Sequence, residues 1–343
     1  MRRILAIDAG GTSTRAVVVD VTGRCHGYGA AGAGNPVSAG IEAAITALTS
    51  AARQAMAGGS GTESISATLV AMAGGGAETA RQQLREGIST LGVPGPITLE
   101  GDLLAMYHSG TAEPRGYVLV AGTGSVAARI ERGRLVQVAD GTGWLLGDAG
   151  SGYWIGHQVA RAVVAALDGR GAPTDLTDLL LGSLSLDAAA AGVDGRPRVL
   201  SDLLETLYGL RPIELARFAP LAFHAREDPV AESILSGAAD ALGATLATVR
   251  RAPLARPVVV GGSVAVSLLT AASPASSSFR AALGDQRIPV RDGLVGAAVL
   301  GLRQADVMVD DEVFARIKST LKEPGQAVPV AAAGTWGHDE GAR

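Results

Sequence analysis

Cysteine is almost absent from this sequence, because Cys25 is the only one among 343 residues. A single cysteine excludes an internal disulfide, a zinc site made of cysteines and an iron–sulfur cluster held by the cysteines of one chain. Such sparing use of cysteine is typical of a reducing compartment, so we expect a cytoplasmic protein. Aromatic residues are scarce too, at 3%, and the core must therefore consist mainly of Ala, Val, Leu and Ile.

Several motifs built on lysine or glycine are also missing. Lys318 and Lys322 are the only lysines, and no Gly-Lys-Ser/Thr sequence exists, which excludes a Walker P-loop. A Gly-x-Ser-x-Gly elbow is absent, and no Gly-x-Gly-x-x-Gly follows the first apolar run, which argues against a dinucleotide fold. The net charge of −4 gives no reason to expect a nucleic acid, because that polyanion needs a basic face.

Long hydrophobic runs are lacking as well. The basic segment Met1–Arg3 is followed by a short apolar run, Ile4–Ile7, that is too short for a signal peptide. Residues Pro257–Phe279 carry no charge, but glycines, Pro274 and several serines interrupt them, so no membrane helix is expected. Hydrophobic residues nevertheless make up 47% of the chain, which predicts a globular protein with a large core.

What is present is a glycine- and threonine-containing turn that occurs twice. The first turn lies within Asp8–Thr14, and the second, Gly122–Ser125, lies between the apolar runs Tyr117–Val120 and Val126–Ile130. A unit of strand, Gly/Thr turn, strand, Gly turn and strand thus repeats about one domain length apart. This weak repeat predicts an α/β fold of two similar domains that face each other. Among the helices, one is expected from Ser38, as N-cap, to the Gly58-Gly59 pair.

Both turns are candidate phosphate sites. Glycines let the backbone approach a phosphate closely, and successive N–H groups and hydroxyls bind its oxygens. Asp8, at the end of the first strand, would repel a phosphate unless a hydrated Mg²⁺ lay between them. The alternative is that each turn is a plain hairpin connection.

Asp102 is a candidate general base. It follows Glu100-Gly101 after a strand and opens a helix, where the helix dipole stabilises a charged carboxylate. We therefore expect Asp102 to stay ionised and to accept a proton from an alcohol. The alternative is a helix-capping aspartate without catalytic work.

Two further glycine-rich segments are candidate binding sites. Gly141–Gly156 contains Trp144 and Asp148 and suits a sugar, which needs hydroxyl acceptors and a flat apolar face; the alternative is a structural loop whose tryptophans pack in the core. Gly261-Gly262-Ser263 follows a buried strand and would let a purine or ribose lie against bare backbone. Its alternative is a strand-to-helix turn that needs close packing.

These segments together resemble the actin-like sugar kinase/Hsp70 superfamily. Within it they resemble the N-acetylglucosamine kinase branch of the BadF/BadG/BcrA/BcrD-type ATPase family, over roughly Met1 to Ala305. The most specific part is Gly143–Ser151, which is close to the W-x-x-G-D-E-G-S pattern of those kinases. The resemblance implies a two-lobed α/β actin-like (ribonuclease H-like) fold with a nucleotide and sugar cleft between the lobes.

The resemblance also implies an activity and its residues. It implies an ATP-dependent kinase that phosphorylates the 6-hydroxyl of N-acetylglucosamine, with ATP and Mg²⁺ as cofactors. Asp102 would be the base, and Asp8 would hold Mg²⁺ through water. The residues that would bind ATP are Gly10, Gly11, Thr12, Ser13, Gly122, Thr123, Gly124, Gly261, Gly262 and Ser263. The residues that would bind the sugar are Asn35, Asp102, Thr123, Trp144 and Asp148.

Ala149 departs from the family pattern, which has Glu at this position beside the sugar. The acceptor can therefore also be glucosamine or glucose, and a third hypothesis is an ATP-binding sugar sensor that phosphorylates nothing. The presence of Asp102, the candidate general base, argues against a sensor that phosphorylates nothing. With Cys25 alone, the chain lacks the cysteine ligands of the iron–sulfur activators in this family and the zinc motif of the related ROK kinases.

The resemblance also divides the chain. Residues 1–112 and about 292–322 are expected to form the N-terminal lobe, residues 113–291 the C-terminal lobe with a helical insertion, and residues 323–343 a flexible tail. A small amino sugar is the expected partner, with neither nucleic acid nor membrane. Relatives make a homodimer a further possibility.

Overall fold

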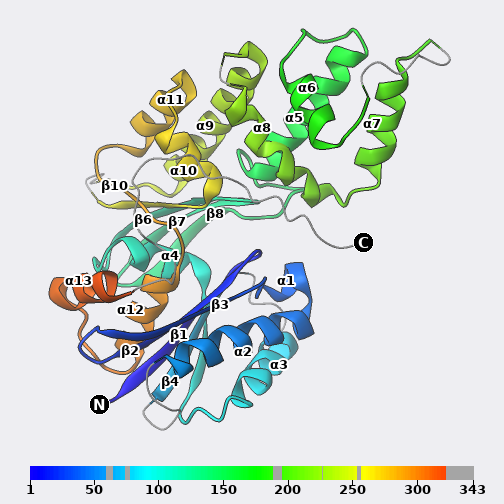
Figure 1. Ribbon diagram of the computed structural model, residues 1–343. Helices are drawn as coiled ribbons and strands as arrows, with labels where there is room; N and C mark the ends of the chain where they lie inside the picture. The colour runs from blue at the N-terminus through cyan, green and yellow to red at the C-terminus, as the bar shows by residue number, and fades with distance from the viewer. Residues whose placement is uncertain (59–64, 74–77, 188–194, 226, 253–255, 322–343) are drawn as a thin grey trace.

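The fold consists of two five-stranded sheets, each with its own helices (Figure 1). The computed structural model describes residues 1–58, 65–73, 78–187, 195–225, 227–252 and 256–321, so the expected tail over 323–343 lies outside the described residues. The first sheet contains β1 (Arg3–Ala9), β2 (Thr14–Asp20), β3 (Cys25–Ala31), β4 (Ile65–Met72) and β5 (Ile97–Gly101). The second contains β6 (Gly116–Ala121), β7 (Ser125–Glu131), β8 (Arg134–Asp140), β9 (Val258–Gly261) and β10 (Arg287–Pro289).

The two sheets have the same topology. Their orders are β3-β2-β1-β4-β5 and β8-β7-β6-β9-β10. In each sheet the first strands along the chain form an antiparallel meander, and the remaining strands add in parallel beside the meander's first strand. The repeat inferred from the two Gly/Thr turns is therefore a repeat of the whole sheet.

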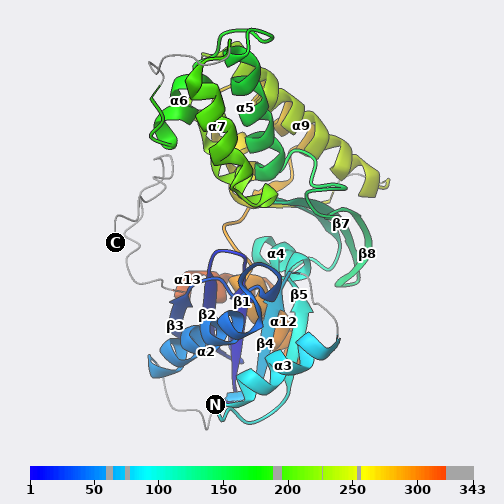
Figure 2. The same ribbon diagram turned by 90° about the vertical axis from the view of Figure 1, so that its right-hand side faces the viewer.

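Helices cover both faces of the first sheet and the outer face of the second (Figures 1 and 2). The helices around the first sheet are α1 (Pro36–Ala39), α2 (Ile41–Ala57), α3 (Glu78–Ser89), α4 (Asp102–Gly110), α12 (Leu294–Gln304) and α13 (Asp311–Thr320). Those on the second sheet are α5 (Gly152–Leu167), α9 (Pro229–Val249), α10 (Ser263–Thr270) and α11 (Pro274–Leu283), with α6 (Leu176–Ser183), α7 (Arg198–Tyr208), a 3-10 helix (Pro212–Phe218) and α8 (Ala219–His224) beyond them.

The single helix expected from Ser38 to Gly58-Gly59 is wrong at its start. The structure has two helices, α1 and α2, separated by Gly40 at φ +84°. A residue in this backbone conformation cannot continue a right-handed helix. The N-cap is Asn35 rather than Ser38, and its Oδ1 accepts a hydrogen bond from Val37 N at 2.8 Å.

The side chains of strand β1 alternate between the two faces of the first sheet. Leu5 and Ile7 pack in the cluster that contains α2, whereas Ile4 and Ala6 pack in the cluster that contains α4 and α12. Successive side chains of a strand point to opposite faces, so a fully apolar strand is buried on both. The first sheet is therefore the middle layer of its lobe.

Helix α4 lies between the two sheets (Figure 2). Its residues Leu104, Ala105 and Tyr107 belong to a core cluster that also takes side chains from β1, β6 and β9. On one side Ala105 meets α12 so closely that a Cβ at Gly296 would overlap the Ala105 carbonyl oxygen. Packing on both sides thus holds α4, and with it Asp102 at its first position, in one place between the sheets.

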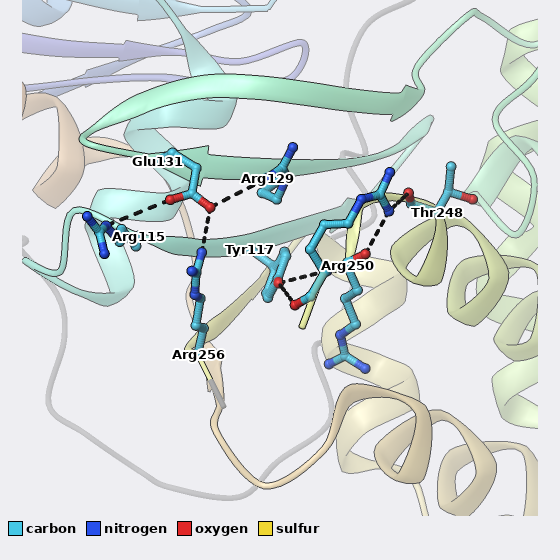
Figure 3. A network of polar contacts seen from close by, with 8 residues as sticks. Arg115, Tyr117, Arg129, Glu131, Thr248, Arg250 and Arg256 are labelled. Carbon is cyan, nitrogen blue, oxygen red and sulfur yellow. Dashed lines mark hydrogen bonds and ion pairs between the residues drawn. The ribbon is translucent and has the colours of Figure 1, made fainter. Parts of the chain in front are cut away.

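An ion-pair cluster joins the end of β7 to residues just before β6 and β9 in the second sheet (Figure 3). Glu131, at the end of β7, lies 2.6 Å from Arg256, 3.5 Å from Arg129 and 3.7 Å from Arg115. The hydrogen bond from Arg256 lowers the pKa of Glu131. Because these groups are partly exposed, the ion pairs should add little to the free energy of unfolding.

Replacing Gly296 by Ala should destabilise the protein by ~3 kcal/mol, because the added methyl has no room beside the α4 backbone. Urea unfolding of the variant and of the wild type measures the difference. Gly182→Ala is the matched control, since Gly182 lies in helix α6 with open space around it, and it should be neutral or slightly stabilising. Equal unfolding midpoints for Gly296→Ala and the wild type would contradict the close packing.

Candidate functional site

The first Gly/Thr turn, Gly10–Ser13, joins β1 to β2. Gly10 N donates to Ser13 O at 2.9 Å, while Gly11 and Thr12 at the tip are exposed. Gly10 O accepts from Gly34 N at 3.1 Å and from Asn35 N at 3.2 Å. The backbone thus brings a residue expected to bind sugar against the turn expected to bind phosphate.

The second turn, Gly122–Gly124, occupies the same position between β6 and β7. Gly122 N donates to Gly124 O at 2.9 Å, and Thr123 at the tip is exposed. The carbonyl of Gly122 accepts from Gly152 N at 2.7 Å, and that of Thr123 accepts from Tyr153 N at 3.1 Å. The turn is therefore attached to the first residues of helix α5.

Gly261, Gly262 and Ser263 connect β9 to α10 beside the second turn. Gly262 has φ +86°, and a Cβ there would overlap the carbonyl oxygen of Ala121 and lie 2.8 Å from Gly122 N. A Cβ at Gly261 would lie 2.6 Å from Met106 Sδ on α4. Backbone packing and its positive φ thus require glycine at 262, whereas Gly261 faces only the flexible Met106 side chain. The structural alternative is supported for Gly262, without excluding a nucleotide nearby.

Asp8 lies at the end of β1 in an acidic environment. Its side chain is buried, and its Oδ2 accepts from Gly293 N at 3.0 Å, just before helix α12. Burial first, and then the charges of Asp292 and Asp102, raise the pKa of Asp8 to about 7, although the hydrogen bond from Gly293 and the charge of Arg15 lower it. Arg15 Nε is 3.5 Å from Asp292 Oδ2.

Asp102 is the first residue of α4, after the N-cap Gly101. Burial raises the pKa of Asp102, while hydrogen bonds from the backbone N–H groups of Leu103 and of Asp102 itself lower it. The terminal N–H groups favour the charged form, as expected at a helix start, but desolvation outweighs them, so the net pKa of Asp102 is raised. That Asp102 is ionised stays a prediction. A raised pKa makes the ionised carboxylate a stronger base.

A second acid, Asp140, organises the segment between β8 and α5. Its Oδ1 accepts from Asp148 N at 2.7 Å and its Oδ2 from Ala149 N at 3.1 Å. Asp148 in turn accepts at Oδ1 from Ser125 N at 3.0 Å, and Ser125 Oγ donates to Ala149 O at 2.9 Å. These bonds tie the segment expected to bind sugar to the second turn.

The packing of Asp148 explains one glycine of that turn. A Cβ at Gly124 would lie 2.8–3.0 Å from the carboxylate of Asp148. Asp148 has φ +58° and is 6% exposed. Burial and the neighbouring charge of Asp140 raise its pKa, against the hydrogen bond from Ser125. Its carboxylate therefore has a fixed position beside the turn.

The two tryptophans of this segment lie in different surroundings. Trp154 packs against the core of the second lobe, as the structural alternative predicts. Trp144 is 38% exposed and meets the ring of Tyr153 edge-on, with the centroids 5.8 Å apart. Tyr153 stacks on His157 at 5.7 Å. Trp144 thus presents a partly exposed ring held by its neighbours.

The donors around the two turns fit a nucleotide with a hydrated Mg²⁺. Within the described part of the chain, no three acidic, histidine or cysteine side chains are arranged to enclose a metal ion. Mg²⁺ bound with a nucleotide needs only one or two carboxylates, because phosphates and waters supply its other ligands. Asp8, a buried acid with other acids close by, fits such a role.

Residues 5–301 match the BadF/BadG/BcrA/BcrD ATPase family. The chain belongs to this family. The family and the two-lobed actin-like fold class expected from the sequence are thus confirmed.

Individual relatives agree with the assignment. The N-acetyl-D-glucosamine kinase of Dictyostelium discoideum is 28% identical over 254 residues, which are 69% of this chain and 76% of the relative. Glucosamine kinase GspK of Vibrio cholerae is 28% identical over 189 residues, which are 54% of this chain and 63% of the relative. The solved structure of a Porphyromonas gingivalis protein has a TM-score of 0.67 at 21% identity, with 89% of this chain and 100% of that chain covered; it supports the fold alone.

For this member of the family, the predicted site residues fall into two groups, one on each lobe. Asp8, the first turn, Asn35 and Asp102 belong to the first group. The second turn, Trp144, Asp148 and Gly261–Ser263 belong to the second. None of the described helices is long and apolar enough to cross a membrane.

Sequence reasoning missed Asp292, Arg15 and Asp140. Asp292 interacts with Asp8 and Arg15 although 277 or more positions separate them, and no local pattern indicates this. Asp140 stands just before Gly141, the first residue of the glycine-rich segment Gly141–Gly156. The only local indication is its position after a strand and before a glycine, where an aspartate often accepts hydrogen bonds from the backbone of a turn.

The pKa of Asp8 leads to a prediction about pH. The folded state keeps a proton on this residue up to about pH 7, whereas an unfolded aspartate loses it near pH 4. The free energy of unfolding should therefore fall as pH rises from about 4 to about 7, by up to about 4 kcal/mol from this residue. Chemical unfolding at several pH values measures this, and Asp8→Asn should flatten the dependence. Parallel profiles for both proteins would contradict it.

Proposed function

We propose that the protein is an ATP-dependent sugar kinase that phosphorylates the 6-hydroxyl of N-acetylglucosamine. The observation that carries the proposal is the equivalence of the two turns in two sheets of one topology, with Asp8 beside the first turn and Asp102 at the head of the helix between the sheets. A phosphoryl transfer needs groups that position and neutralise phosphates and a base for the acceptor hydroxyl.

Each group has a role in this proposal. The backbone N–H groups and hydroxyls of Gly10–Ser13 and Gly122–Gly124 bind the phosphates, and Gly261–Ser263 borders the adenosine. Asp8 holds a hydrated Mg²⁺, which neutralises charge on the phosphates when it is bound. Asp102 accepts the proton of the sugar hydroxyl as that oxygen attacks the terminal phosphorus.

The sugar is bound from both lobes in this proposal. Asn35 and Asp102 contact it from the first lobe, and Thr123, Trp144 and Asp148 contact it from the second. Asp102 does this work as an ionised carboxylate, and its raised pKa keeps it basic enough to take a hydroxyl proton. Domain closure around the sugar would exclude water and limit hydrolysis of ATP.

Glucosamine is the second candidate acceptor, because Ala149 departs from the family pattern at a position beside the sugar. The residue offers a methyl group where the family pattern has a carboxylate, and a glucosamine kinase is among the relatives. N-acetylglucosamine is placed first because the Dictyostelium kinase shares a longer stretch of the chain. A sensor that binds ATP without turnover is the alternative from another class.

A coupled assay of ADP release over a panel of sugars tests the proposal. N-acetylglucosamine, glucosamine, glucose and N-acetylmuramic acid are compared with a sugar-free control. We expect N-acetylglucosamine to give the highest kcat/KM. A preference for glucosamine would replace the first substrate by the second, and no sugar above the control would leave only the sensor.

Asp102→Asn should lower kcat about 10²–10⁴-fold, because the amide cannot take the hydroxyl proton. Binding of sugar, measured by calorimetry, should largely survive, since the amide oxygen still accepts a hydrogen bond. Glu100→Gln is the control, because Glu100 is a neighbouring acid whose Oε1 binds the Gly101 N–H. Near wild-type turnover in Asp102→Asn would make Asp102 a structural residue only.

Asp140→Ala should raise the KM for the sugar by about tenfold or more, which corresponds to ~1.4 kcal/mol. The change removes the acceptor of two backbone N–H groups in the Asp148–Ala149 segment. The KM for ATP should change much less. Asp285→Ala, at an exposed position, controls for the loss of an acid, and an unchanged sugar KM in Asp140→Ala would show that the segment holds its shape without Asp140.

A further inference from the structure

Arg15 lies directly opposite Asp8 in the first sheet, but its ion pair is with a different acid. In the antiparallel register of β1 and β2, Asp8 pairs with Arg15, and the Cβ atoms of directly opposite residues are about 4.5–5.5 Å apart. Opposite charges at such positions usually attract each other across the strands. The ion pair of Arg15 is instead formed with Asp292, whose Oδ2 lies 3.5 Å from Arg15 Nε.

Two acceptors hold the Arg15 side chain in this position. Asp292 is one, and Ser13 Oγ is the other, which accepts from Arg15 Nη1 at 3.1 Å. The side chains of Arg15 and Asp292 are only 19% and 12% exposed, so water screens their attraction less than that of a surface pair. Consistent with this arrangement, Asp292 affects the pKa of Asp8 more than Arg15 does.

Asp292 is itself held at the start of helix α12. Its Oδ1 accepts from Leu294 N at 3.1 Å. The next residue, Gly293, donates its N–H to Asp8 Oδ2 at 3.0 Å, and a Cβ at this glycine would lie 2.7 Å from Asp8 Oδ1. The segment therefore approaches Asp8 with a backbone N–H and a residue without a side chain, while its carboxylate holds the guanidinium.

A guanidinium paired with Asp8 would compete with a metal ion. Arginine keeps its charge at all ordinary pH values and binds the same carboxylate oxygens that a hydrated cation would use. Mg²⁺ bound with a nucleotide depends on only one or two carboxylates of the protein. Neutralising Asp8 would therefore remove much of what the chain offers to the ion.

We propose that Asp292 is a positioning residue that holds Arg15 away from Asp8 and so keeps Asp8 free for the hydrated Mg²⁺ of the nucleotide. This inference rests on the proposed function, in which Asp8 holds that ion. It adds a residue that acts through Arg15 rather than by touching the substrates.

Calorimetry of ADP binding with and without Mg²⁺ tests the proposal, because the ratio of the two affinities measures what Mg²⁺ adds. Asp292→Asn keeps an oxygen that can accept from Leu294 N but loses the charge. It should lower this ratio by about tenfold, because Arg15 can then pair with Asp8. Asp292→Ser, which also keeps an acceptor, should do the same. A pH well above the pKa of Asp8 keeps Asp8 ionised in all these proteins.

Removal of Arg15 separates this role from a general defect. In Asp292→Asn/Arg15→Gln, the ratio should return to within about twofold of that of Arg15→Gln alone, since no guanidinium remains to compete for Asp8. A structural defect of Asp292→Asn, or a lost contact between Asp292 and the hydrated ion, would persist in the double variant. An unchanged ratio in Asp292→Asn, or an equal loss with and without Arg15, overturns the proposal.

Two further comparisons distinguish failure of this inference from failure of the proposed function. Asp8→Asn should lose the gain in ADP affinity that Mg²⁺ gives, and a wild type without such a gain would reject the role of Asp8 and this inference together. Glu42→Gln removes an exposed acid of the same lobe and should keep the wild-type ratio. Circular dichroism verifies that each variant is folded. When the wild type and Asp8→Asn behave as expected, the Asp292 variants alone decide the inference.

Discussion

The packing of helix α4 between the two sheets is the constraint on which the candidate site depends. Gly296 of α12 approaches the backbone at Ala105, and Gly110, at the end of α4, leaves space for Val259 of the second sheet. A larger residue at either glycine would push one lobe away from the helix. Because α4 is held from both sides, Asp102 at its first position keeps one location relative to β1 and β9. The proposed base is thus placed by the core and needs no mobile loop.

The two turns show how one local motif acquires different partners. The carbonyl of Gly10 accepts the N–H groups of Gly34 and Asn35, whereas the carbonyls of Gly122 and Thr123 accept N–H groups of α5. Each turn is thereby attached to a segment proposed to bind sugar. In the proposed enzyme, phosphate and acceptor sites share backbone hydrogen bonds within each lobe, so closure would move them as units.

Asp8 and its acidic neighbours lower the stability of the first lobe when no ligand is bound. Burial and the charges of Asp292 and Asp102 raise the pKa of Asp8, and a group so placed lowers stability once it ionises. Arrangements of this kind are typical of functional sites, where a bound partner compensates for the cost. A cation beside the phosphates would do so here, and Arg15 offsets only part of the charge.

The sequence by itself determined the repeated hairpins, Asp8 at a strand end, Asp102 at a helix start and the absence of a cysteine cluster, because each depends on residues adjacent in the chain. Local pattern also placed Ser38 as a cap, but Gly40 breaks the helix and Asn35 takes that role. Only the tertiary structure decided that Asp292 lies beside Asp8, that Asp140 holds the Asp148 backbone, and that burial outweighs the helix terminus at Asp102. Those outcomes depend on groups brought together from distant positions and on how much water the packed core excludes, and neither is written in a local run of residues.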